Sequence, residues 1–201
     1  YVFALPAPTD YAETAKLTAS DAAASDNFGL SVAIDGNTVA IGAPGAGTGG
    51  AVYVLRTSDG GATYGQVAKL TADSRHSNQV FGVSVAIDGD TVVIGAYLDD
   101  DGGTWSGSAY IFRTTDGGAT YGQIAKLTVS DAAAYDYFGR SVAIDGTTIV
   151  AGAYGDDDGG SASGSVYVFR TTDGGATYGQ VAKLTASDAA ANDNFGWSVA
   201  I

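Results

Sequence analysis

The feature that most constrains the fold of this chain is a repeat of about 57 residues. Phe-Gly pairs begin successive copies at Phe28, Phe81, Phe138 and Phe195, at spacings of 53, 57 and 57 residues. The segment 113–123 recurs letter for letter at 170–180. A period of this length indicates an array of equivalent supersecondary units, each of which buries its apolar surface against its neighbours.

Each copy predicts four short strands. In the copy that starts at Phe28, apolar alternation and turn residues place them at 31–34, 38–41, 51–55 and 66–70. Asp35-Gly36, flanked by apolar alternation, predicts a two-residue hairpin turn in which both residues have positive φ. In the crossover before the next Phe-Gly pair we expect a short helical turn capped by an aspartate.

Four antiparallel strands per unit predict an all-β fold, a β-propeller of four-stranded blades, because a row of sandwiches needs about 100 residues for each domain. The predicted units are 1–27, the atypical end of a preceding blade; 28–80, 81–137 and 138–194, three blades; and 195–201, the first strand of a further blade. These pieces leave strand edges unpaired in a closed ring. We therefore expect an incomplete ring, completed by further blades of the same protein or by other protein chains.

The charge of the chain excludes some partners. The formal net charge is −13, and Glu13 is the single glutamate among 22 acidic residues. Such a surface repels the phosphates of nucleic acids and of anionic lipids, so no nucleic acid partner is expected. No apolar run approaches the roughly 18 residues of a membrane-spanning helix.

Two sequence patterns resemble known repeats. Phe28-Gly29 followed by Gly42-Ala43-Pro44 resembles the FG-GAP repeat of integrin α subunits, although a later copy reads Gly95-Ala96-Tyr97. This resemblance implies a propeller and an extracellular or cell-surface location. The segments 57–64, 114–121 and 171–178 resemble the Asp-box of propellers such as sialidases. That resemblance implies a turn between the third and fourth strands, in which the aspartate accepts hydrogen bonds from backbone N–H groups.

Acidic loops are the predicted metal sites. The segments 99–103 and 156–160, both Asp-Asp-Asp-Gly-Gly, lie between the second and third strands of their copies. Adjacent carboxylates repel one another unless they are hydrated or neutralised, and calcium prefers flexible oxygen ligands. We therefore predict calcium as a cofactor, with a solvated acidic rim as the alternative. The predicted ligands are Asp99, Asp101, Asp156 and Asp158.

No catalytic or cofactor-binding residue is predicted, because recurrent residues do not form the asymmetric environments that catalysis needs. The recurrent Arg56, Arg113 and Arg170 are interpreted as a structural hairpin pair in each copy. Among the residues that do not recur, Arg75-His76 are interpreted as exposed loop residues. Trp105 and Trp197 are also unique in the repeat. Trp105 either packs on its own blade or stacks on a sugar or a partner protein.

The function expected from these observations is that of a non-enzymatic extracellular module. It would be a structural or adhesive propeller that makes protein–protein or matrix contacts and is stabilised by calcium. The alternative is a carbohydrate-active or carbohydrate-binding propeller, similar to a sialidase or a lectin, whose partners are glycans.

Overall fold

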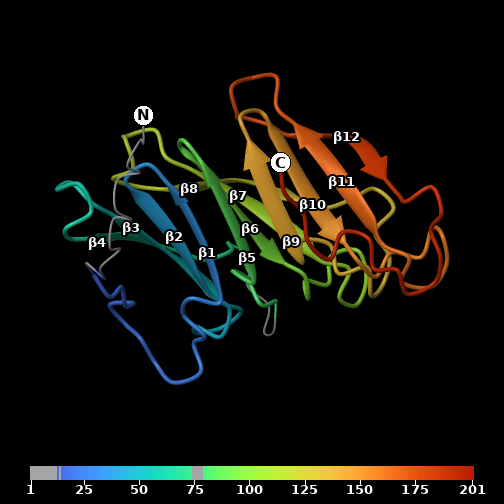
Figure 1. Ribbon diagram of the computed structural model, residues 1–201, viewed down its shortest axis with the longest axis horizontal. Coiled ribbons are helices and arrows are strands. Elements are labelled where there is room, and N and C mark those ends of the chain that lie inside the picture. Colours follow the sequence, from blue (N-terminus) through green and yellow to red (C-terminus); the bar gives the residue numbers. More distant parts are fainter. Residues whose placement is uncertain (1–12, 14, 74–78) are drawn as a thin grey trace, which may run out of the picture.

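The computed structural model describes residues 13, 15–73 and 79–201, which form three four-stranded antiparallel sheets (Figure 1). In each sheet the strands follow one another in sequence order. The predicted all-β architecture of propeller blades is therefore confirmed, and the described residues form a partial propeller. The strands are β1 (Ser31–Asp35), β2 (Thr38–Ala43), β3 (Ala51–Arg56), β4 (Gly65–Leu70), β5 (Ser84–Asp88), β6 (Thr91–Ala96), β7 (Ser108–Arg113), β8 (Gly122–Leu127), β9 (Ser141–Asp145), β10 (Thr148–Ala153), β11 (Ser165–Arg170) and β12 (Gly179–Leu184).

The three blades lie side by side, and the first strand of each lies next to the first strand of its neighbour (Figure 1). Strand β5 therefore contacts both β1 and β9, and the outer strands fan away from them. Residues 195–201 form no strand but repeat the contacts of the other joints, since Phe195 bridges to Gly164 and the carbonyl oxygen of Gly196 accepts a 2.8 Å bond from Ser141 Oγ. None of the described segments is a helix long and apolar enough to cross a bilayer.

Apolar residues from two neighbouring blades share the core at each of the two joints between blades. Val52 and Val54 of the first blade pack in one cluster with Phe81 and Ile94 of the second. Phe81 is completely buried and meets the ring of Tyr110 edge-on, with centroids 5.3 Å apart. The central strands β2, β3, β6 and β7 are buried along almost their whole length. Neighbouring blades cover both faces of β6 and β7, whereas residues of the segment 17–28 cover one face of β2 and β3. Burial between blades is therefore the main source of stability, as expected for a repeat array.

Backbone groups also meet at the joint between blades. Ser31 Oγ donates a hydrogen bond of 2.8 Å to the carbonyl oxygen of Gly82, in the Phe-Gly pair of the next blade. A Cβ atom on Gly42 would lie only 2.0 Å from that same oxygen. The next joint repeats this arrangement with Ser84, Gly139 and Gly95. The Phe-Gly and Gly-Ala pairs are therefore the two halves of a joint at which a side chain has no room.

The hairpin turns differ from the prediction by one residue. Asp35 pairs with Thr38 in the β1–β2 ladder, so the turn residues are Gly36 and Asn37, and only the glycine has a positive φ. The carboxylate of Asp35 instead accepts a 2.7 Å hydrogen bond from the N–H group of Gly89 in the next blade. The predicted Asp-Gly turn was therefore wrong, and this aspartate connects two blades.

The crossover segments contain turns with left-handed residues where a short helical turn capped by an aspartate was expected. Ser25 and Asn27 have φ values of 70° and 57°, which interrupt a right-handed helix. Between them, Asp26 accepts a 2.8 Å hydrogen bond from the N–H group of Ala23. The aspartate therefore closes a turn from its C-terminal side, and the helical prediction was wrong.

The joint predicts that Gly95→Ala destabilises the protein. Its Cβ would lie 1.9 Å from the carbonyl oxygen of Gly139, so the blades would have to separate. We expect a loss of about 2–3 kcal/mol in the free energy of unfolding, measured by urea denaturation. Gly122→Ala, with no atom within 4 Å of the added carbon, is the control and should cost less than about 1 kcal/mol. Equal losses in the two variants would contradict this account of the joint.

Candidate binding face formed by the blade loops

The recurrent arginines connect blades. Arg56 Nη1 donates to the carbonyl oxygen of Gly117, in the turn between the third and fourth strands of the next blade, and Arg113 does the same to Gly174. The prediction of a structural role agrees with these contacts, but the expected pairing within one hairpin was wrong. Arg170, which occupies the equivalent position in the third blade, is exposed.

The turns reached by these arginines contain the hydrogen bonds that the Asp-box resemblance implies. Asp59 accepts 2.9 and 2.6 Å bonds from the N–H and hydroxyl groups of Thr63, and a 2.8 Å bond from the hydroxyl of Thr57. These bonds lower the pKa of Asp59 to about 2. The hydrogen bonds that hold the turn therefore explain why its polar residues recur in each copy.

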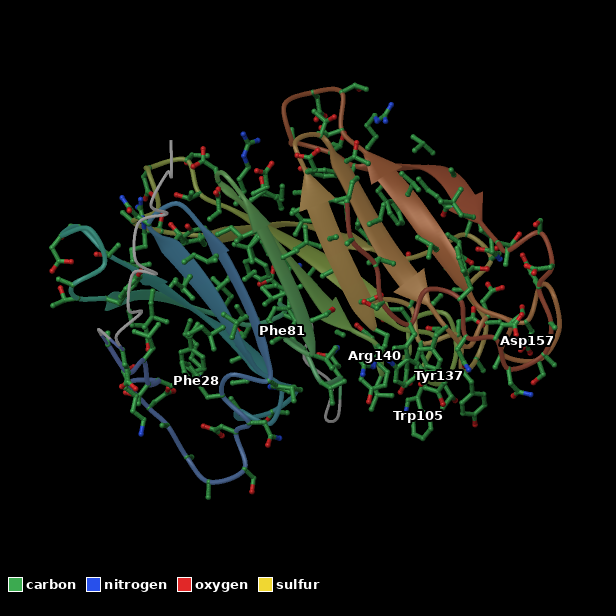
Figure 2. The ribbon with its side chains drawn as sticks, viewed as in Figure 1. Phe28, Phe81, Trp105, Tyr137, Arg140 and Asp157 are labelled. Atoms are coloured by element: carbon green, nitrogen blue, oxygen red, sulfur yellow. The ribbon has the colours of Figure 1, made fainter. Side chains whose placement is uncertain are left out.

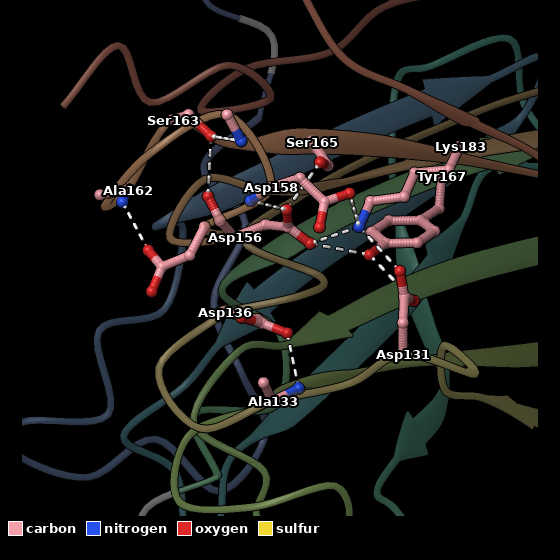
Figure 3. Close-up of polar contacts among 12 residues, drawn as sticks. Asp131, Ala133, Asp136, Asp156, Asp158, Ala162, Ser163, Ser165, Tyr167 and Lys183 are labelled. Atoms are coloured by element: carbon pink, nitrogen blue, oxygen red, sulfur yellow. Dashed lines mark hydrogen bonds and ion pairs between the residues drawn. The ribbon is translucent and has the colours of Figure 1, made fainter. Parts of the chain in front are cut away.

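At the other end of the third blade, one lysine gathers three carboxylates (Figure 3). Lys183 Nζ, from β12, lies 2.8 Å from Asp156 and 2.6 Å from Asp158, both in the loop after β10. It also lies 2.7 Å from Asp131 of the preceding crossover. The hydroxyl of Tyr167 donates to Asp156 and Asp131 at 2.9 and 3.1 Å. The ammonium group therefore connects the loop, the crossover and the outer strand.

The second blade contains a closely related cluster. Lys126 Nζ lies 2.9 Å from the fully buried Asp99 and also pairs with Asp101, while Tyr110 donates a 2.6 Å bond to Asp99. Burial acts to raise the pKa of Asp99, but the hydrogen bonds from Tyr110 and Lys126 outweigh it and hold the pKa below its usual value. Burial and the carboxylate of Asp99 raise the pKa of Tyr110 to about 12. In the first blade, Ala46 stands where the other copies have this buried aspartate.

The four predicted calcium ligands thus lie in two pairs, each pair around a lysine. Carboxylate oxygens of Asp131, Asp156 and Asp158 lie within 4.8 Å of one another, a spacing that a cation could bridge. The ammonium of Lys183 lies among those oxygens, so a calcium ion would compete with it. Calcium binding by these residues stays a prediction.

On the same side of the blades, aromatic side chains form a continuous cluster (Figure 2). The rings of Trp105 and Tyr137 have centroids 6.2 Å apart, and Tyr137 stacks on Tyr154 at 4.8 Å and an angle of 5°. Tyr154 in turn meets Trp197 edge-on at 4.5 Å. We call Trp105, Tyr137, Tyr154 and Trp197 the aromatic row. It brings together residues of the second blade, the crossover, the third blade and the start of the next repeat.

Three further side chains flank the row. Tyr135, which is 52% exposed, packs edge-on against Trp105 with centroids 5.6 Å apart. The guanidinium of Arg140 lies 5.8 Å from the ring centre of Tyr97 and 4.9 Å from that of Trp197, within the range of cation–π attraction. Trp105 and Trp197 remain 40% and 52% exposed. Trp105 therefore packs on neighbouring rings and still presents surface to solvent.

Several of these aromatic residues have backbone conformations that bulky residues avoid. Trp105, Tyr135 and Tyr137 have φ values of 56°, 72° and 58°. The third copy holds Ala162, Asn192 and Asn194 at the same positions, and asparagine adopts this region more readily than tyrosine. The conformation belongs to the repeat, since Ser25 and Asn27 of the first copy also adopt it, and a bulky residue in it costs of order 1 kcal/mol or more. Tyr135 and Tyr137 were not among the residues predicted from the sequence, although their place at positions that hold asparagine in the third copy was a readable signal.

Three other residues were noted from the sequence. Arg75 and His76 fall outside the residues that the structure describes, and Glu13 is exposed. Trp105 and Trp197 were noted separately from the sequence, and the structure brings them into one cluster through Tyr137 and Tyr154.

Removal of the ammonium group of Lys183 should destabilise the third blade. Lys183→Met leaves the buried carboxylate of Asp156 without its cation, so we expect a loss of about 3 kcal/mol in unfolding free energy. Lys69→Met is the matched control, because Asp21, the ion-pair partner of Lys69 among the described residues, is half exposed and the pair should contribute less than about 1 kcal/mol. If urea denaturation gave similar losses of unfolding free energy for both variants, the burial of Asp156 would not be the cause of the cost. Calorimetric titration should give a larger calcium heat for Lys183→Met than for the wild type.

The buried Asp136 predicts a specific pH dependence of the stability of the protein. Burial, followed by the negative charge of Asp156, raises its pKa from 3.8 to about 6, and its side chain is 4% exposed (Figure 3). Between about pH 4 and 6 the folded protein binds this proton more tightly than the unfolded chain, so this group's contribution to stability declines as pH rises. Asp136→Asn removes the titration but retains an acceptor for the N–H group of Ala133.

We therefore expect Asp136→Asn to gain about 1–2 kcal/mol of stability relative to the wild type as pH rises from 4 to 7. Thermal and urea unfolding at each pH would measure the difference. A difference between variant and wild type that stays constant over this range would contradict the raised pKa.

Comparison with known proteins agrees with the geometry. The FG-GAP repeat family matches residues 11–55, 64–112, 121–169 and 178–201. No curated protein sequence matches the chain. The crystal structure of Sqt1 from Saccharomyces cerevisiae is similar, with a TM-score of 0.51 and 11% identity, over 83% of this chain and 37% of that one, which shows a similarity of fold alone. With four successive matches that span most of its length, the chain belongs to the FG-GAP repeat family.

Proposed function

We propose that this protein is a non-enzymatic extracellular propeller module with a structural or adhesive role. One observation carries the proposal: recurrent polar residues are used to hold blades and turns, while aromatic residues that do not recur are exposed together at the loop face. Exposed aromatic and arginine side chains are typical of surfaces that bind partners.

The family supports this proposal in general terms. FG-GAP propellers are generally non-enzymatic interaction modules and are typical of extracellular or surface proteins. Near-identical blades would also repeat any weak contact along the array, and several linked weak contacts give strong overall binding. Adhesion and an extracellular location are the finer steps that we propose for this chain.

The open flank of the first blade supports protein partners. Val32 and Ile34 of β1 are 58% and 64% exposed, whereas their counterparts Val85 and Ile87 of β5 pack against the preceding blade. A surface of this kind fits another blade of the same repeat, from the same protein or from another chain. The acidic loops are a separate part of the proposal, in which calcium adds stability at Asp99, Asp101, Asp156 and Asp158.

An enzymatic role has less support. Glycoside hydrolysis requires two carboxyl groups in different environments on either side of a bond. Of the buried carboxylates of this face, Asp99 and Asp156 are paired with Lys126 and Lys183, and Asp136 accepts a hydrogen bond from the N–H group of Ala133.

The proposal is tested by adhesion. Beads coated with the protein should be retained on extracellular matrix, increasingly with coating density because of avidity. The combined variant Trp105→Ala, Tyr135→Asn, Tyr137→Asn carries the residues of the third copy and should fold normally, with retention at least about fivefold lower. Asp90→Thr, which places the third copy's residue in a distant turn, is the control and should adhere like the wild type. Equal retention of the wild type and the combined variant, or hydrolysis of matrix components by the protein, would refute the proposal.

A further inference from the structure

We propose that the aromatic row binds a linear, uncharged polysaccharide. This inference rests on the proposed adhesive function and deepens it, since it names the class of matrix ligand that the loop face recognises. The site consists of Trp105, Tyr137, Tyr154 and Trp197, with Arg140 beside it.

The first argument is the geometry of the row. Tyr137 and Tyr154 stack on each other at 4.8 Å and 5°, so the row presents its surface to solvent mainly at its two ends, Trp105 and Trp197. A pyranose presents a flat face of C–H groups, which packs on the electron-rich face of an aromatic ring while the hydroxyl groups stay in water. A packed row that ends in two half-exposed tryptophans therefore offers two stacking surfaces, which fit separate sugars of one extended chain.

The second argument is the supply of polar groups along the row. The guanidinium of Arg140 is held between the rings of Tyr97 and Trp197, where its N–H groups can donate to hydroxyl groups. At the other end, Asp100 fixes the loop by accepting a 2.7 Å bond from the N–H group of Trp105, and its side chain is exposed. Sugars need such donors and acceptors beside a stacking surface.

The third argument is the surface beyond the row. Trp105 forms one wall of an open depression of about 610 Å³, which continues the aromatic surface toward the first blade. Its lining includes the amide of Asn27, the hydroxyl of Thr48 and the apolar side chain of Leu98. None of the described residues that line it is charged.

Charge selects among glycans. The negative surface repels chains that carry uronic acids or sulfates, whereas an uncharged chain approaches without that penalty. A protein partner would use the same residue types, but protein hot spots cluster at the enclosed centre of an interface. Here the most exposed rings are at the two ends of a line, which favours a linear ligand.

Comparison of the copies distinguishes the residues of this site from those that the fold requires. Most of the differences in side-chain character between the second and third copies fall at or beside the row. Because the third copy keeps the same backbone conformation with small or polar residues, the aromatic residues are not needed for folding. The paired positions are Val83 and Arg140, Leu98 and Gly155, Trp105 and Ala162, Tyr135 and Asn192, and Tyr137 and Asn194.

The test uses intrinsic fluorescence, because the chain has two tryptophans and both belong to the row. The probes are linear oligomers, from two to six sugars, of β-1,4-glucose, α-1,4-glucose, β-1,4-N-acetylglucosamine and β-1,4-xylose. An oligomer of galacturonic acid is the charged control. We expect at least one neutral series to change the fluorescence, with a Kd that falls as the oligomer lengthens, and no response to the charged oligomer.

Variants identify the site. Trp105→Ala and Tyr137→Asn should each raise the Kd for the best oligomer at least about tenfold, measured by calorimetry, with circular dichroism unchanged. Asp90→Thr should leave the Kd unchanged. Trp197→Val, which carries the residue of the second copy at that position, provides an independent variant at the other end of the row. It should raise the Kd of long oligomers more than that of short ones.

The outcomes separate this inference from the adhesive function. Absence of binding to every neutral series, or binding unaffected by Trp105→Ala and Trp197→Val, overturns the inference. If retention on matrix depends on the row but no oligosaccharide binds, the row is a protein contact, so the inference fails while the adhesive function stands. If the oligomers bind at the row but coated beads are not retained, the inference is upheld and the adhesive function fails.

Discussion

The whole structure depends on a close contact of backbone on backbone between neighbouring blades. At each joint the carbonyl oxygen of a Phe-Gly glycine lies where the Cβ of a Gly-Ala glycine would be, and a serine hydroxyl holds that same oxygen. Because no side chain intervenes, the separation of two blades is set by covalent geometry and van der Waals contact. The apolar cluster around Phe81 or Phe138 then forms at a fixed distance from the preceding blade.

Ion pairs at the loop face hold in place the loops that carry the aromatic side chains. In the third blade Lys183 holds the loop after β10 through Asp156 and Asp158, and Tyr154 of the aromatic row lies just before them in the chain. In the second blade Lys126 does the same for the loop that carries Trp105. Buried ion pairs contribute little net stability compared with apolar packing, but breaking one is costly. Their value here is that they order loops rich in glycine.

The sequence predicted the parts of the fold that depend on local periodicity, and it missed those that depend on neighbours. Alternation and turn residues were sufficient for four strands per copy. The partners of Asp35 and Arg56 lie in the next blade, about 54 and 61 residues away, so their roles could not be read from local patterns. Likewise, the sequence places Trp105 and Trp197 far apart, and only the packing of Tyr137 on Tyr154 joins them. The acidic loops were recognised, but their lysine partners come from a distant outer strand.

Identical joints have a consequence for how such a chain changes over generations. The contact between the first and second blades uses the same residue types as that between the second and third. Deletion or duplication of one complete unit therefore rejoins surfaces that already match, and no compensating substitution is required. Recombination within the gene can thus alter the number of blades in single steps, while point substitutions at the loop tips alter what each blade recognises.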